Sequence, residues 1–119
     1  MIMKRKTALG TIEIASEVFK FISGLAANNC FGVKGMVSRT VSDGIVCLLK
    51  RDNLSKGVRV SFAKDGAVNI ELHIAVEHGL NIPVICQAII EQVRYTVEKS
   101  TGVSVSLVEV CVDSIMAGQ

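Results

Sequence analysis

The sequence lacks any segment long enough to cross a membrane as a helix. Such a helix needs about 18 consecutive apolar residues, and the longest apolar runs, residues 44–49 and 82–90, are far shorter. Pro83, the only proline, and Gln87 interrupt the second run. We therefore expect no direct insertion into a membrane.

The chain also lacks a strong excess of either charge. Thirteen lysines and arginines against eleven acidic residues give a net charge of +2, which is too small to predict binding to nucleic acid or to an anionic membrane. The basic residues 4–6 (Lys-Arg-Lys) have no apolar segment behind them, so they do not form a secretion signal. We interpret residues 1–8 as a flexible basic tail and residues 9–119 as one domain.

No two cysteines have the CxxC spacing of a redox or metal motif. Cys30, Cys47, Cys86 and Cys111 lie far apart, and none has a histidine close to it in sequence. Each lies in an apolar or alternating segment, which is typical of buried or half-buried thiols in a reducing cytoplasm. A disulfide framework or a zinc site explains this pattern less well. We expect a cytoplasmic protein without a metal or a cofactor.

Catalytic motifs are equally scarce. The sequence has no glycine-rich phosphate loop and no nucleophile elbow. His73 lies near Glu71 and His78 follows Glu77, and a histidine beside a carboxylate can transfer protons. Such neighbours on an alternating segment are far more often solvated surface. The sequence therefore predicts a protein that is not an enzyme.

The clearest structural signal is the alternation of apolar and polar residues over residues 67–77. It predicts a β-strand with one buried and one solvated face. Residues 58–62 alternate in the same way, and Asp65 and Gly66 favour a tight turn between the two segments, which should pair as an antiparallel hairpin. The solvated face carries these side chains: Arg59, Ser61, Asn69, Glu71, His73 and Glu77.

Two helices are predicted from apolar residues that recur every three or four positions. The first covers residues 15–28. The second, over residues 82–100, is the longest element, with Asn81 as its cap and Pro83 in its first turn. Beside its main apolar face, this helix carries a narrower apolar strip formed by Val84, Ala88 and Tyr95.

Three further strands are predicted over residues 9–14, 33–41 and 103–115. Residues 42–51 favour a short helix, although residues 45–49 could also form a buried strand, and a polar connection follows over residues 53–57. In the last strand the alternation changes phase, which predicts a β-bulge near Leu107 and Val108. Together these elements predict a two-layer α+β fold, with a mixed sheet and the two main helices on one of its faces.

One short motif suggests a different function. Gly32, Lys34 and Gly35 belong to a GxxG sequence, the loop with which KH domains hold a nucleic-acid backbone. A helix should precede this motif, but a strand rather than a second helix should follow it. Binding of single-stranded RNA is therefore the alternative hypothesis, and nucleic acid is the less favoured partner.

Several motifs, in order along nearly the whole chain, resemble those of the alkaline shock protein family. Residues 10–14 (GTIEI) resemble its opening strand, and residues 32–36 (GVKGM) resemble its first turn. Residues 79–83 (GLNIP) resemble its Gly-x-x-Ile-Pro link into the second helix. Residues 97–103 (VEKSTGV) and 108–112 (VEVCV) resemble the helix end and the last strand.

This resemblance implies a non-enzymatic protein of the bacterial cell envelope stress response. It implies a cytoplasmic protein that forms homo-oligomers or binds a membrane-anchored partner, and it carries over no catalytic residue or cofactor. A half-apolar composition also favours a contact surface on so small a domain. The expected contact residues lie either on the second helix or on the solvated sheet face: Val84, Ala88, Tyr95, Arg59, Glu71 and His73.

Overall fold

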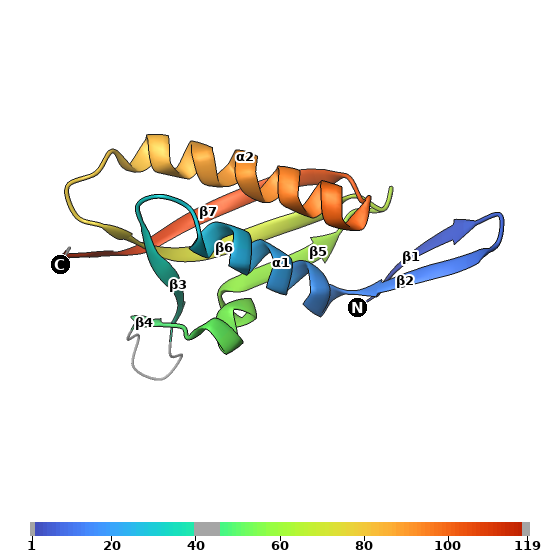
Figure 1. The fold of residues 1–119 in the computed structure, drawn as a ribbon, viewed down its shortest axis with the longest axis horizontal. Helices are drawn as coiled ribbons and strands as arrows, with labels where there is room; N and C mark the ends of the chain where they lie inside the picture. The colour runs from blue at the N-terminus through green and yellow to red at the C-terminus, as the bar shows by residue number, and fades with distance from the viewer. Residues whose placement is uncertain (1, 40–45, 118–119) are drawn as a thin grey trace.

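The computed structural model describes residues 2–39 and 46–117. Two helices, α1 (Ser16–Asn28) and α2 (Ile82–Thr101), lie along one face of a mixed five-stranded sheet (Figure 1). The strands of this sheet are β3 (Val33–Arg39), β4 (Val46–Leu48), β5 (Val58–Phe62), β6 (Val68–Glu77) and β7 (Val105–Met116). The predicted α+β fold, with both main helices on one side of the sheet, is confirmed.

Strand β6 is the centre of the sheet. It pairs in parallel with β7 along its whole length, so its antiparallel partners β5 and β3 share the opposite edge, one after the other. The predicted alternation is confirmed, because the five apolar side chains on one face of β6 are at most 1% exposed. These side chains are Val68, Ile70, Leu72, Ile74 and Val76. Full burial of each contributes about 1.5–3 kcal/mol to the stability of the fold.

Helix α2 covers part of the core and connects β6 to β7. The Asn81 side chain accepts a hydrogen bond from the Val84 amide at 3.3 Å, as expected of the cap. At the other end Gly102 adopts a positive φ of 72°, the left-handed conformation that glycine adopts most readily. The buried side chains recur every fourth residue along one side of the helix: Ile85, Ile89, Val93 and Val97. The parallel pairing of β6 with β7 requires a crossover of this kind.

The last strand contains the predicted bulge, one residue earlier than expected. Val105 pairs with Val68 and Leu107 pairs with Asn69, so Ser106 is an extra residue in β7. Ser106 and Leu107 are both exposed, which explains the change of phase in the sequence. A second irregularity, which the sequence did not predict, lies at Asp113, between the partners of Ile74 and Ala75.

The segment after β3 differs from the expected short helix. Residues 42–45 lie outside the described part of the chain, and Val46–Leu48 form β4, antiparallel to β3, so the strand alternative holds there. The expected polar connection is instead a 3-10 helix, η1 (Arg51–Gly57). Its Leu54 is buried against Gly24 of α1, where an added Cβ would lie 3.2 Å from the Leu54 carbonyl oxygen. No periodic pattern in the sequence predicted the burial of Leu54.

The expected flexible tail over residues 1–8 is wrong where the structure describes it. Strand β1 (Ile2–Thr7) pairs antiparallel with β2 (Gly10–Ala15), and this hairpin projects from the body as a separate two-stranded sheet (Figure 1). Two of the basic residues have side-chain partners: Lys4 lies 3.7 Å from Glu13 in the same hairpin, and Arg5 donates a hydrogen bond to the carbonyl of Gly102, at the end of α2, at 3.1 Å. Pairing with β2 therefore orders a segment that looks unstructured when it is considered alone.

The position of Leu54 gives a test of the packing of η1. We expect Leu54→Ala to lower the free energy of unfolding by roughly 2–5 kcal/mol, because it leaves a cavity between η1 and α1. Urea denaturation followed by circular dichroism measures this change. Lys56→Ala, an exposed substitution in the same helix, is the control and should change stability by less than about 0.5 kcal/mol. Equal stability of the two variants would contradict the observed packing.

Candidate functional site

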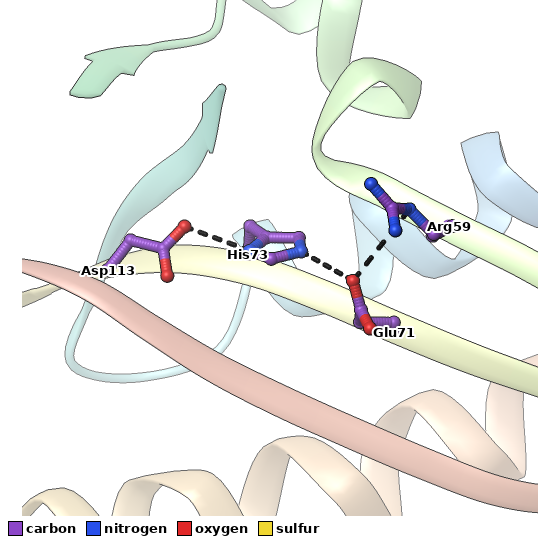
Figure 2. A network of polar contacts seen from close by, with 4 residues as sticks. All are labelled: Arg59, Glu71, His73 and Asp113. Carbon is purple, nitrogen blue, oxygen red and sulfur yellow. Dashed lines mark hydrogen bonds and ion pairs between the residues drawn. The ribbon is translucent and has the colours of Figure 1, made fainter. Parts of the chain in front are cut away.

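A polar network lies on the sheet face opposite the helices. It joins side chains from three neighbouring strands: Arg59 from β5, Glu71 and His73 from β6, and Asp113 from β7 (Figure 2). The alternation of β6 places Glu71 and His73 on this face, because their neighbours Ile70, Leu72 and Ile74 point into the core. The strand pairing then brings Arg59 directly opposite Glu71.

His73 is held by a carboxylate on each side of its ring. Nε2 lies 2.7 Å from Glu71 Oε2, and Nδ1 lies 2.9 Å from Asp113 Oδ2. A ring that contacts two carboxylates satisfies both contacts only when both nitrogens carry protons and donate them. Arg59 Nε approaches the same Glu71 oxygen at 3.9 Å. The geometry therefore favours a charged imidazolium between two anions.

The pKa values in this network follow from the same contacts. Partial burial lowers the pKa of His73, but the hydrogen bonds to Glu71 and Asp113, together with their negative charges, outweigh it and leave that pKa above its ordinary value. The pKa of Glu71 is lowered, first by the hydrogen bond from His73 and then by the positive charges of His73 and Arg59, against an opposing effect of burial.

Cys111 lies beside the network, directly opposite His73 in the pairing of β6 with β7. Its thiol is half-buried and free. Burial raises the pKa of this thiol, and the negative charges of Glu71, Glu109 and Asp113 raise it further. The sequence predicted only one of four similar structural thiols at Cys111, with Glu109 and Asp113 two residues away on either side. The strand pairing adds Glu71 and His73 to its surroundings.

The expected contact residues fall into two groups on opposite sides of the molecule. Arg59, Glu71 and His73 meet in the polar network, whereas the helical strip lies on α2. Val84 and Tyr95 of that strip are well exposed, and Ala88 lines a groove between α1 and α2. The two groups thus belong to two separate surfaces, which correspond to the two alternatives of the prediction: the second helix and the solvated sheet face. Their role in binding stays a prediction.

The groove between the helices has a volume of about 590 Å³ and contains apolar residues that the sequence did not single out. Phe21 of α1 is 47% exposed, and Phe31, in the turn after α1, is 81% exposed. Both line the groove, together with Ala88 from α2. Phe31 could not be identified from periodicity because it lies outside the helix. An aromatic ring so exposed at the edge of a groove is a candidate for contact with another protein.

The GxxG motif has structural explanations in this fold. Gly32 has a φ of +85°, and an added Cβ would lie 2.6 Å from Ile85 Cδ1. Gly35 lies in β3, which begins at Val33, so a strand follows the motif, as expected from the sequence. Lys34 is exposed. The RNA-binding hypothesis gains no support from the described residues.

Comparison with known proteins identifies one family over nearly the whole chain. The model of the alkaline shock protein 23 family, described by a cell envelope-related function, matches residues 4–117. The uncharacterized protein YloU of Bacillus subtilis is 31% identical over 116 residues, which cover 97% of this chain and 96% of that protein. The uncharacterized protein YqhY of the same organism is 34% identical over 104 residues, or 87% of this chain and 76% of that protein.

Solved structures with a similar fold include a variant of the MamM CTD. It matches with a TM-score of 0.50 at 14% sequence identity, over 87% of this chain and 94% of that chain. At this identity the likeness shows the fold alone. In the described part of the chain, neither helix is long and apolar enough to span a membrane.

The raised pKa of His73 predicts a pH-dependent stability. The charged ring is stabilised only in the folded state, so its contribution is complete below the ordinary histidine pKa and is lost as the pH rises through the higher folded value. We expect the free energy of unfolding to fall as the pH rises through this interval. Urea denaturation at a series of pH values, in buffer that contains a metal chelator, measures this change.

His73→Gln is the matched variant for this test. It keeps a polar side chain at the position but cannot titrate, so its stability should lose this pH-dependent component. A profile of the same shape in both proteins would show that His73 does not titrate differently in the folded and unfolded states.

Proposed function

The chain belongs to the alkaline shock protein 23 family, whose function is cell envelope-related, and from this membership we propose that it is a non-enzymatic interaction module that assembles with itself. The observation that carries the proposal is the apolar groove between α1 and α2 with its exposed aromatic rim. Soluble monomers rarely expose contiguous apolar surface of this kind without a partner.

The helical layer offers an apolar surface of suitable shape for a second copy. Phe31 and Phe21 line one side of the groove, and Ala88 lines the other. The strip formed by Val84, Ala88 and Tyr95 continues from Ala88 along α2. A symmetric dimer brings the same patch of both copies together, so each aromatic side chain would be buried against the partner. Stable contacts of this kind bury about 800 Å² on each partner.

The other surfaces fit self-association less well. The polar network on the sheet face already pairs its charges with one another: His73 with Glu71 and Asp113, and Arg59 with Glu71. The outer edge of β7 could extend the sheet into a second copy, but it is interrupted at Ser106 and Asp113. Irregularities of this type hinder pairing between exposed edges.

We place the protein in the cytoplasm, near the membrane only through a partner. Two observations support this part of the proposal: the envelope-related function of the family and the absence of a membrane-spanning helix from the described residues. A membrane-anchored protein could bind the same groove as a second copy, in competition with self-association. The proposal therefore assigns one surface to both kinds of partner.

The proposal predicts that a charge in the groove separates the copies. We expect Phe31→Glu to weaken self-association about 30-fold, corresponding to roughly 2 kcal/mol for an aromatic contact residue. Tyr95→Glu should weaken it in the same direction if the strip on α2 takes part. Size-exclusion chromatography with light scattering over a range of micromolar concentrations measures both effects.

Leu107→Glu is the matched control, because it places the same charge on an exposed apolar residue of the opposite face, where Leu107 is 53% exposed. It should leave assembly unchanged. Loss of assembly in this variant, but not in Phe31→Glu, would show that the sheet face is the contact surface. A monomer at every concentration of the unmodified protein would overturn self-association altogether.

A further inference from the structure

Two side chains of the polar network, Glu71 and His73, converge on the open sheet face with a third, Cys111, which belongs neither to the network nor to the proposed assembly surface. Glu71, His73 and Cys111 each place one potential ligand atom within 4.8 Å of the other two. Glu71 and His73 come from β6, and Cys111 comes from β7, directly opposite His73. We propose that Glu71 Oε2, His73 Nε2 and Cys111 Sγ bind a divalent transition-metal ion of the Zn²⁺ class.

The donor set suits such an ion better than a harder cation. A thiolate, an imidazole nitrogen and a carboxylate oxygen are the three ligand types found on zinc, whereas Mg²⁺ and Ca²⁺ select oxygen alone. Zinc lies about 2.0–2.3 Å from such atoms, so two ligands on a tetrahedral ion are roughly 3.3–3.8 Å apart. The contact of 2.7 Å between His73 and Glu71 must open slightly, and the ion then takes the place of the proton between them.

Asp113 supplies the outer contact that metal-bound histidines usually have. Its carboxylate lies 2.9 Å from His73 Nδ1, the ring nitrogen that does not face Glu71. A carboxylate there keeps the proton on Nδ1, fixes the ring plane and leaves the Nε2 lone pair free for the metal. Asp113 acts in this way as a positioning residue.

The charges around the site also favour a cation. Glu71 and Glu109 lie directly opposite each other on neighbouring strands, an arrangement of like charges that destabilises a sheet. Arg59 lies near Glu71, but its side chain is 81% exposed and can move into solvent. On binding, the ion takes the neutral imidazole, the thiolate and the carboxylate as ligands, and His73 Nε2 and Cys111 Sγ each release one proton to water. Two negative ligands then balance the two positive charges of the ion.

Three protein ligands leave a fourth position open. The site lies at the surface, with His73 and Glu71 each about 30% exposed, so the fourth ligand is water or a group from another molecule. A shallow hollow of about 240 Å³ adjoins it and shares the Glu71 side chain. The site is on the opposite face from the helical groove, so it can bind metal whether or not the protein assembles through that groove.

Cobalt(II) is the probe for this site, because a cobalt–thiolate bond has a charge-transfer absorption in the near ultraviolet. We expect reduced, metal-free protein to develop this band on titration and to saturate at one equivalent. Cys111→Ser should lose the band, and His73→Gln should weaken binding at least ten-fold. Asp113→Asn should weaken it about 10- to 100-fold.

Cys86→Ser is the matched control, because Cys86 is also a half-buried free thiol but lies on α2, away from the site. It should keep the band and the affinity, and Phe31→Glu should keep them too, even if it abolishes assembly. Absence of the band in the unmodified protein would overturn the proposal, and that outcome does not depend on how any variant folds. Loss of the band in Cys86→Ser, but not in Cys111→Ser, would also overturn it.

Discussion

The pairing of β6 with three other strands is the constraint on which the rest of this structure depends. One face of β6 is buried under α1 and α2, and both of its edges form backbone hydrogen bonds. The strand therefore cannot slip by one residue without moving five buried aliphatic side chains into water. This fixed register determines which polar side chains reach the opposite face and which side chains of β5 and β7 lie beside them.

The two irregularities of β7 show how sensitive the open face is to that register. Before Ser106, Val105 lies opposite Val68, the residue 37 positions earlier. After Ser106 the offset is 38 positions, which places Cys111 opposite His73. Without the extra residue, Val110 would lie there instead. The second irregularity lies at Asp113, whose carboxylate contacts the ring of His73.

These relations explain how far the sequence could predict the structure. The alternation at β6, the cap at Asn81 and the hairpin turn at Asp65 and Gly66 are local signals, because each follows from neighbouring residues and elementary backbone chemistry. The phase change in β7 located the bulge to within one residue. The sequence also placed Glu71 and His73 on the solvated face of the sheet.

The partners of Glu71 and His73 could not be predicted, because Asp113 and Cys111 lie about forty residues away. The extra residue at Ser106 decides whether Cys111 or Val110 lies opposite the histidine. The same limit applies at the start of the chain. Residues 4–6 alone resemble a solvated tail, and only pairing with β2 reveals a strand. Phe31 and Leu54 are single apolar residues outside any periodic segment. Tertiary packing alone decides that Phe31 is exposed and Leu54 is buried.

The projecting hairpin has a consequence for the dynamics of the molecule. Its strands pair with each other and not with the main sheet, and an isolated two-stranded hairpin is marginally stable in water. The β1–β2 arm can therefore open while the core beneath α2 stays intact. Its amide hydrogens should exchange with solvent through local openings of low free energy, whereas those at the centre of β6 exchange only when the whole molecule unfolds.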